Sequence, residues 1–343
     1  MPLDIDQHRK LAIAPMMELT DRHYRYLARL LSKHALLYTE MLTCAAIIHG
    51  DRQYLLGKHS LEDPVVLQLG GSDPDQMASA ARIGEQWGYQ EINMNVGCPS
   101  DRVKAGRFGA CLMAEPARVA DTVSAMQDAV CIPVSVKCRL GIDRDDSYTA
   151  LQSFVGQVAQ SGCSHFIIHA RKAWLDGLSP KENRTIPPLR YDYVYRLKRE
   201  FPDLHISING GIESLDSTLE HLQHVDGVMM GRAAYYSPAL LAEADNCVFG
   251  SLADGFTHTA NSDTLSDIAR AYALYMQEWI KQGVRPSVMS RHLIALFQQV
   301  PGARLWRRHL SEQAGKTRDA VALVEGALAY LEREAQVSAA RSA

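Results

Sequence analysis

The sequence has little that could build a metal cluster or a set of disulfides. Its 343 residues include seven cysteines, and no two of these form a CxxC pair. Zinc sites and thioredoxin-like redox sites need such closely spaced pairs, and an odd number of cysteines does not fit a complete disulfide framework. We therefore predict no bound metal, free thiols and a reducing, cytoplasmic location.

Long apolar runs are also missing. No stretch approaches the roughly 20 apolar residues that a membrane-spanning helix requires, and the acid-containing start MPLDIDQHRK lacks the apolar run of a signal peptide. We therefore expect no membrane partner. The formal net charge is only -3, so any argument for nucleic-acid binding must come from local basic patches.

Repeats and low-complexity tracts are absent as well, and what remains is a regular alternation of strand-like and helix-like segments. Eight short apolar or β-branched runs recur, and a longer segment with helical spacing follows each of them. Most runs do not alternate with polar residues, which is typical of strands buried on both faces. The runs are residues 11–16, 36–41, 65–70, 91–97, 134–140, 165–170, 205–210 and 227–232.

This alternation predicts an α/β fold, a (β/α)8 TIM barrel, because eight strand–helix units fill about 230 residues. An open doubly wound sheet would usually carry GxGxxG after its first strand, and APMMELTD has no such motif. The alternation stops near residue 240, and helical periodicity resumes from residue 264. We predict a catalytic barrel over residues 1–245 and a helical domain of about four helices over residues 260–335.

A TIM barrel places its active site at the carboxyl ends of its strands, and polar or glycine residues gather at those positions in this sequence. The fourth run ends near Asn93, Asn95 and Cys98, and the fifth carries Lys137 and Arg139. The other runs supply Pro15, Met16, Met17, Gln68, His169, Arg171, Asn209, Gly210, Gly211, Gly231 and Arg232. We expect these side chains to form one site.

Glycine motifs follow the seventh and eighth runs. Barrels often bind phosphate in these two loops, and glycine allows backbone N–H groups to approach phosphate oxygens closely. The motifs supply Gly210, Gly211 and Gly231, and Arg232 adds a countercharge. Either motif alone could be an ordinary turn, but both occur at the expected strands. We therefore predict a cofactor that carries a phosphate.

Lys137 lies inside the apolar run VSVKCRL. It should face a cavity or a charged partner, because burying an unpaired ammonium is costly. A flavin would fit, since negative charge grows at its N1 and C2=O when it is reduced and an ammonium stabilises that charge. His169 could donate to the same ring or to the substrate, and the Gln68 amide could bind the ring's uracil-like edge. A carboxylate partner for Lys137 and a structural role for His169 are the alternatives.

Cys98 stands at the start of a glycine-bounded loop that contains Arg102, Lys104 and Arg107. A free thiol has a pKa of about 8.5, so it is mostly protonated at neutral pH and can donate a proton. We predict that Cys98 is a general acid that acts beside a polyanion. A buried structural cysteine is the ordinary alternative.

Basic residues near two other segments suggest RNA as that polyanion. From residue 279 to 311 there are six basic residues and no acidic one, and Arg304 and Arg307 are among the six. The long loop after the sixth run adds Asn183 and Arg184. Arginine and lysine provide the attraction to phosphate that RNA binding needs. A solvated helix face is the alternative for any single arginine.

At this point the chain resembles the tRNA-dihydrouridine synthases, over nearly its whole length. The segment INMNVGCPSDRVKAGRFGA contains the Asn-x-Gly-Cys-Pro core of that family. The segments APMMELTD, VSVKCRLG, SINGGI and GVMMGRAAY stand where the family has equivalents. The segments LSPKENRTIPPLRYD and SRHLIALFQQVPGARLWRRHLSE look like the A subfamily.

The resemblance implies FMN as the cofactor, NADPH as the reductant and the tRNA D-loop as the substrate, with U20 and U20a as targets in the A subfamily. It implies hydride transfer from flavin N5 to uracil C6 and proton transfer from Cys98 to C5. Asn95 matches a contact to the target uridine, and we expect a monomer. The FMN contacts would be Pro15, Met16, Met17, Gln68, Lys137, His169, Asn209, Gly210, Gly211, Gly231 and Arg232.

Other functions stay open. A flavin barrel that acts on a small pyrimidine, such as a dihydroorotate-type dehydrogenase, would share the glycines and Lys137, but it leaves the basic C-terminal segment unexplained. A non-catalytic RNA-binding barrel would give Cys98, Lys137 and His169 no function. A phosphate-sugar aldolase or isomerase with a Schiff base on Lys137 gives Cys98 no task.

Overall fold

The structure is a computed structural model that describes residues 5–250 and 260–342. The chain forms two compact units. The first comprises the described residues of 1–22 and 35–231, and the second comprises those of 23–34 and 232–343. The division into domains at residues 245 and 260 stays a prediction.

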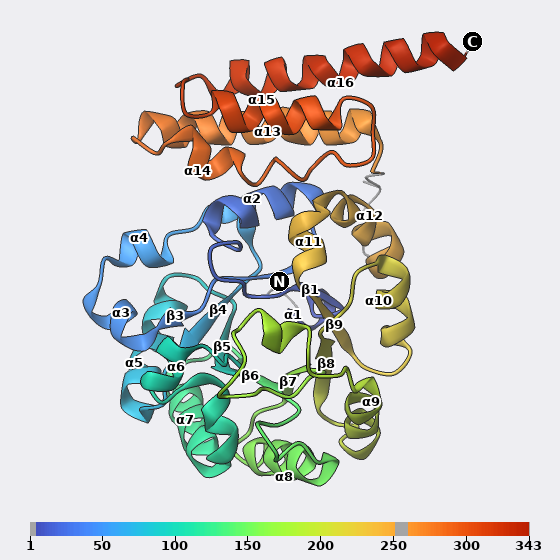
Figure 1. Ribbon diagram of the computed structural model, residues 1–343. Coiled ribbons are helices and arrows are strands. Elements are labelled where there is room, and N and C mark those ends of the chain that lie inside the picture. The colour runs from blue at the N-terminus through green and yellow to red at the C-terminus, as the bar shows by residue number, and fades with distance from the viewer. Residues whose placement is uncertain (1–4, 251–259, 343) are drawn as a thin grey trace. The chain divides into compact units, whose positions relative to one another are not determined.

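The first unit is built on a sheet of parallel strands (Figure 1). Its strands are β1 (Leu11–Ile13), β2 (Leu36–Tyr38), β3 (Leu42–Thr43), β4 (Val65–Gly70), β5 (Glu91–Val96), β6 (Val134–Arg139), β7 (His165–His169), β8 (His205–Asn209) and β9 (Gly227–Met230). Neighbours follow the order β2-β1-β9-β8-β7-β6-β5-β4-β3, and β2 also pairs with β4. That last pairing closes the sheet.

The closed sheet is an eight-stranded barrel, because β2 and β3 together occupy the position of one strand. Both pair with β4, at Leu37–Val65 and at Leu42–Leu69. Each of the eight runs expected to be a strand contains one, and the predicted TIM barrel is confirmed. Most observed strands end one to three residues before the predicted limit, where the polar loop residues begin.

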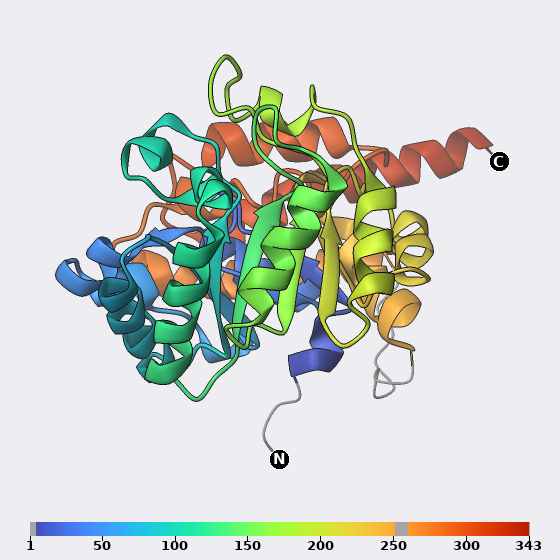
Figure 2. The same ribbon diagram turned by 90° about the horizontal axis from the view of Figure 1, so that it is seen from below.

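Helices lie between successive strands and surround the barrel (Figures 1 and 2). They are α3 (Cys44–His49), α4 (Arg52–Leu56), α5 (Pro74–Gln86), α6 (Asp101–Ala105), α7 (Pro116–Ala129), α8 (Tyr148–Ala159), α9 (Tyr191–Glu200) and α10 (Leu215–Leu222). In the chain, α1 (Ile5–His8) precedes β1 and α2 (Arg22–Leu31) follows it. Local sequence explains how α5 begins, since Asp73 Oδ1 accepts the Gln76 N–H at 2.9 Å and Pro74 occupies the first turn. Most residues of α2 belong to the second unit.

The strands are buried on both faces, as their unbroken apolar runs predict. All six residues of β4 and all six of β5 are buried. Aliphatic side chains of the strands are removed from water almost entirely, and each contributes about 1.5–3 kcal/mol to folding. The barrel is therefore a packed core that positions the loops at its two ends.

The second unit is helical. It contains α11 (Arg232–Tyr236), α12 (Leu241–Ala244), α13 (Ser262–Lys281), α14 (Pro286–Ser290), α15 (Ala303–Gln313) and α16 (Ala320–Ser342). Trp306 on α15 is fully buried and donates its indole N–H to Leu293 O. Its ring packs edge-on against that of Phe297, with 4.8 Å between the ring centroids. Four of these helices lie within 262–342, as expected for the predicted helical segment. No helix in the described ranges has both the length and the apolar character needed to cross a bilayer.

Candidate active site

A chain of hydrogen-bonded side chains crosses the barrel interior on neighbouring strands. Gln68 Nε2 donates to Asn93 Oδ1, and Asn95 Nδ2 donates to Gln68 Oε1, both at 2.8 Å. Asn93 Nδ2 donates in turn to Ser135 Oγ at 2.8 Å. Buried amides are costly unless they are bonded. Their mutual bonds therefore fix the orientation of the Gln68 and Asn95 side chains at the end of the barrel where β5 ends. The loop that follows β5 carries Cys98, Arg102, Lys104 and Arg107, and we call it the cysteine loop.

Cys98 is half-buried, and its backbone is held on two sides. Asn95 Oδ1 accepts the N–H groups of Gly97 and Cys98 at 3.1 and 3.0 Å, and the Ala110 N–H binds Cys98 O at 2.9 Å. The thiol itself lies 3.5 Å from Ser100 Oγ. A held backbone and a partly exposed thiol suit a group that must deliver a proton to a bound molecule.

The backbone behind Cys98 also requires a glycine. Gly109 has a φ of +73°, and a Cβ at this position would lie 2.6 Å from Cys98 O. A side chain there would be strained and would push on the cysteine backbone. The glycine of the predicted signature therefore has a direct steric reason.

Lys137 reaches across the barrel to β8. Its Nζ donates to Asn209 Oδ1 at 3.0 Å, and Asn209 Nδ2 donates to Met229 O at 2.7 Å. Burial, and then the charge of Arg139, lower the pKa of Lys137 to about 8. Within the described residues no carboxylate pairs with Lys137, so the predicted alternative of an ion pair is not what the structure contains. The ammonium stays mostly charged at neutral pH.

His169 ends β7 with its Nδ1 buried and without a hydrogen-bond partner among the described residues. Burial, and then Arg139 and Lys137, hold its pKa well below the usual value, so the ring is neutral. The ring lies against Gly210, whose φ is +111° and where an added Cβ would approach His169 Cε1 to 3.2 Å. An unsatisfied buried nitrogen beside bare backbone is the kind of site that an additional polar ring would complete.

Comparison with known proteins identifies this arrangement. Residues 12–334 match the protein family described as "Dihydrouridine synthase (Dus)". The chain belongs to the dihydrouridine synthase family. The predicted family is therefore confirmed, and this family is flavin-dependent and reduces uridine in tRNA to dihydrouridine.

Curated relatives and a solved structure agree with this membership. Proteins named tRNA-dihydrouridine(20/20a) synthase share 54% identity over 322 residues in Shewanella oneidensis (94% of this chain, 93% of the relative) and 53% over 334 residues in Escherichia coli strain K12 (96% and 94%). The Synechocystis protein of that name shares 55% over 303 residues (88% of each). A 2-naphthoyl-CoA reductase complex is similar in fold alone, with a TM-score of 0.53 and 11% identity over 68% of this chain and 49% of that chain.

The predicted flavin contacts of this dihydrouridine synthase family member lie at several strand ends. Lys137 donates to Asn209, and the His169 ring lies close enough to Gly210 that an added Cβ there would be 3.2 Å from His169 Cε1. Gly231 has open space around it, with Ala14 Cβ at 4.0 Å, so no close contact among the described residues demands a glycine. Pro15, Met16 and Met17 follow β1. Met16 packs against a cluster of buried hydrophobic residues, and Met17 is 57% exposed. Gly211 has a φ of +73°, and Arg232 begins α11 in the second unit.

The residues predicted to contact RNA differ in their exposure. Arg107 and Arg184 are exposed at the barrel, and Arg304 and Arg307 are exposed on α15; the Arg102 side chain lies outside what the structure describes. Asn183 is fully buried. Its amide oxygen accepts the Trp174 N–H, and its amide N–H groups bind the carbonyls of Trp174 and Leu178. Asn183 therefore organises its own loop, and this geometry argues against its predicted role as an RNA contact.

Lys104 has protein partners. Its Nζ donates to Leu175 O at 3.1 Å and pairs with Asp176 at 2.5 Å. These contacts connect α6, in the cysteine loop, to the loop after β7, and both loops extend from the same end of the barrel (Figure 2). Sequence reasoning did not find Asp176, because nothing in its neighbourhood marks it as a partner of a residue 72 positions away.

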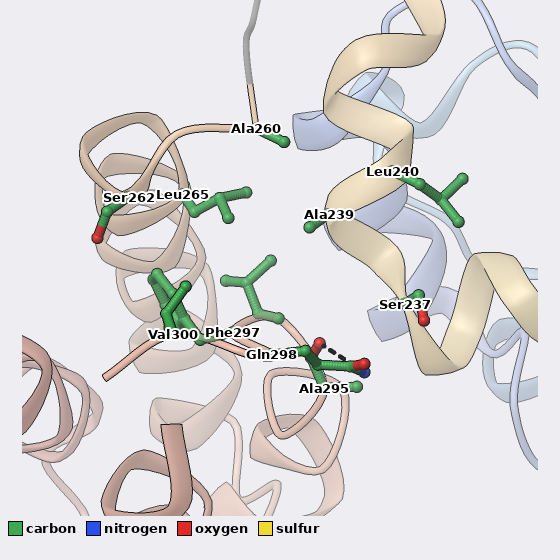
Figure 3. Close-up of a pocket in the computed structure, with 11 residues that line it drawn as sticks. Ser237, Ala239, Leu240, Ala260, Ser262, Leu265, Ala295, Phe297, Gln298 and Val300 are labelled. Atoms are coloured by element: carbon green, nitrogen blue, oxygen red, sulfur yellow. Dashed lines mark hydrogen bonds between the residues drawn. The ribbon is translucent and has the colours of Figure 1, made fainter. Parts of the chain in front are cut away.

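The second unit contains a separate small cavity of about 150 Å³ (Figure 3). Its walls are mostly alanine, leucine, valine and phenylalanine side chains, and Gln298 Nε2 donates to Ala295 O at 3.3 Å at its edge. Titratable groups are absent from its described lining, so we do not assign the chemistry to it. Within the described ranges, no group of three or more His, Cys, Asp or Glu side chains could hold a metal ion.

Proposed function

We propose that this protein reduces the C5=C6 bond of uridines in the tRNA D-loop to 5,6-dihydrouridine, with U20 and U20a as targets. The names of the curated relatives, at 53–55% identity, support this substrate. One observation carries the chemistry: Asn95 holds the backbone of Cys98 at the end of the barrel where Lys137 and the neutral His169 provide hydrogen-bond donors. We also propose a monomer that acts in the cytoplasm.

FMN is the cofactor that these residues fit best, with NADPH as its reductant. The buried Nδ1 of His169 lacks a partner among the described residues, and Lys137 lacks a carboxylate there, so both can serve an acceptor-rich ring. Gln68 keeps one amide N–H beyond the bond it makes to Asn93. When bound and reduced, the flavin supplies the hydride that goes to C6 of the uracil. Gly210 and Gly211 would allow the backbone to approach its phosphate.

The protein's own part in the reaction is proton delivery and orientation. Cys98 donates the proton that C5 needs, so that one hydride and one proton together saturate the double bond. Asn95 Nδ2 donates one N–H to Gln68, and its second N–H can reach a uracil oxygen. Asn95 would therefore orient the base while its oxygen holds the backbone of Cys98.

The tRNA must present an unstacked uridine, since a base inside a helix cannot reach a buried site. Exposed cations would attract the phosphates: Arg107 and Arg184 from the barrel loops, and Arg304 and Arg307 from α15. Arg102 and Lys104 complete the set from the cysteine loop. We propose that residues 1–245 carry the flavin and residues 260–335 bind tRNA.

An anaerobic absorbance experiment tests the proposal. The purified protein is reduced with NADPH, unmodified tRNA is added, and the oxidised flavin band is followed. Rapid return of the band with tRNA is the expected result. Reoxidation by a small pyrimidine but not by tRNA would replace the proposal with a small-molecule reductase, and the absence of flavin after reconstitution with FMN would overturn it.

A further inference from the structure

Arg139, the last residue of β6, is a buried arginine with no carboxylate partner among the described residues. Only 4% of it is exposed, and no ion pair within the described ranges involves it. Burial, together with the charges of Arg184 and Arg171, lowers its pKa to about 10, so it remains a cation at neutral pH. Burying a cation without an acid is costly. Its other contacts must explain why it is there.

Those contacts are three backbone carbonyls on two loops. Arg139 Nε donates to Gly97 O at 2.9 Å, and Nη1 donates to Lys172 O at 3.0 Å and to Asn183 O at 2.9 Å. Gly97 immediately precedes Cys98, while the other two carbonyls belong to the loop after β7. The planar guanidinium can serve acceptors in several fixed directions, which a single ammonium cannot do.

The contact to Gly97 O completes the support of the Gly97–Cys98 dipeptide. Asn95 Oδ1 accepts both of its N–H groups, and Ala110 N binds Cys98 O. Gly97 O is the remaining polar group of this backbone, and Arg139 is the donor that binds it. Without Arg139, the backbone that carries the thiol could rotate about the Asn95 contact.

The contacts to the second loop fix Arg139 itself. The Asn183 side chain holds the turn that presents Asn183 O. Its Oδ1 accepts the Trp174 N–H, and its Nδ2 donates to Trp174 O. Lys104, on the cysteine loop, binds Leu175 O in the same turn. The two loops are therefore joined at a buried point by Arg139 and at an exposed point by Lys104.

We propose that Arg139 is a positioning residue that sets the place of the Cys98 thiol through Gly97 O. The inference rests on the proposed function, in which Cys98 donates the proton to C5. A misplacement of about 1 Å can lower a rate by roughly 10²-fold. A lysine at this position keeps the charge but cannot span the three carbonyls.

The test compares R139K with R29K in full-length protein. Arg29 is the control, because it is also buried and also donates to backbone carbonyls, those of Ser32 and Lys33, but belongs to the second unit. For R139K we expect normal flavin content, normal reduction by NADPH and roughly 100-fold slower reoxidation by tRNA. For R29K we expect all three to match the wild type.

A second readout does not depend on turnover. The rate at which iodoacetamide alkylates Cys98 is measured by mass spectrometry in flavin-free protein, with Cys111 on a separate tryptic peptide as the internal reference. R139K should change the Cys98 rate several-fold and leave the Cys111 rate unchanged. If wild-type protein shows no tRNA-dependent reoxidation, the proposed function fails while this readout still decides the role of Arg139.

Other results would overturn the inference. Unchanged Cys98 alkylation and unchanged tRNA-dependent reoxidation in R139K would show that Arg139 does not place the thiol. If R139K does not fold, R139Q, whose amide can serve one carbonyl, takes its place with the same expectations. Failure of both variants to fold would mean that Arg139 holds the barrel together rather than the cysteine loop.

Discussion

The Cys98 thiol has an oxygen within hydrogen-bonding reach, the Ser100 hydroxyl at 3.5 Å, and its backbone is bound to Asn95. The other cysteines differ from it. Cys138 and Cys163 are fully buried, and burial raises the pKa of each to about 12. They stay protonated and packed. Unlike Cys138 and Cys163, Cys98 combines a held backbone with partial exposure.

Replacement of Cys98 by alanine should separate the two halves of the reaction. C98A should bind flavin and be reduced by NADPH at the wild-type rate, but it should reoxidise with tRNA about 10²–10⁴-fold more slowly, which is the range for loss of a general acid. Stopped-flow absorbance measures both steps. C163A, a buried cysteine outside the site, is the control, and full tRNA-dependent activity in C98A would remove the acid role.

The lowered pKa of Lys137 predicts how the rate of flavin reduction changes with pH. Burial, and then Arg139, lower its pKa to about 8, so the ammonium is present below that pH and is lost as the pH rises through it. If the charge stabilises reduced flavin, the rate of flavin reduction by NADPH should fall above about pH 8. K137M should be slower and lack this fall, whereas K58M, which removes a lysine paired with Asp63, should retain it. A K137M profile identical to that of the wild type would contradict the role.

Between elements, the contact of α6 with the loop after β7 connects the cysteine loop to its neighbour. Lys104 donates to Leu175 O and pairs with Asp176, whose side chain is 88% exposed. An exposed ion pair contributes little to stability. The pair is instead placed where a phosphate could compete with Asp176 for the ammonium.

We therefore expect D176N and K104A to act on RNA binding in opposite directions. D176N should bind tRNA a few-fold more tightly at low salt, because Lys104 loses its competing carboxylate. K104A should bind more weakly, with the slope of log K against log salt reduced by about 1. Fluorescence anisotropy with labelled tRNA over a salt series measures both. Equal slopes for K104A and the wild type would show that Lys104 does not contact phosphate.

The barrel as a whole depends on a buried charged cluster on its strands. Arg9 Nη2 pairs with Glu91 Oε2 at 2.5 Å, His165 Nδ1 lies 3.2 Å from Glu91 Oε1, and Ser135 binds the same carboxylate. Burial opposes ionisation of Glu91, but His165 and Arg9 outweigh it and lower the Glu91 pKa to about 2. The cluster ties β5 to β6, β7 and the segment before β1.

Stability should therefore respond to acid through Glu91. Its folded-state pKa lies below the ordinary value, so its contribution is fully present above about pH 5 and is lost as the pH falls toward 2. E91Q should lower the free energy of unfolding by roughly 3–5 kcal/mol at neutral pH, because Arg9 is left buried without its main carboxylate partner. Urea unfolding at several pH values measures this. The difference in free energy of unfolding between wild type and E91Q should become smaller as the pH falls. A difference that does not change with pH would refute the role of ionised Glu91.

Local patterns in the sequence were enough to predict the barrel. Unbroken apolar runs mark strands buried on both faces, and helical spacing between them leaves a closed parallel sheet as the natural arrangement. Such strands bring their carboxyl ends together, so the order of residues along the chain already assigns Asn95, Cys98, Lys137 and His169 to one end of the barrel.

Contacts between distant loops could not be predicted in this way. Asn183 has the sequence context of an exposed loop residue, yet its loop closes around its amide. Lys104 finds its acidic partner 72 residues away, and Arg139 finds carbonyls on two loops. Local sequence determined which segments became strands and helices, because hydrophobic period and capping act over a few residues. Only the tertiary structure determined which loop atoms meet, because that depends on how the closed barrel arranges segments far apart in the chain.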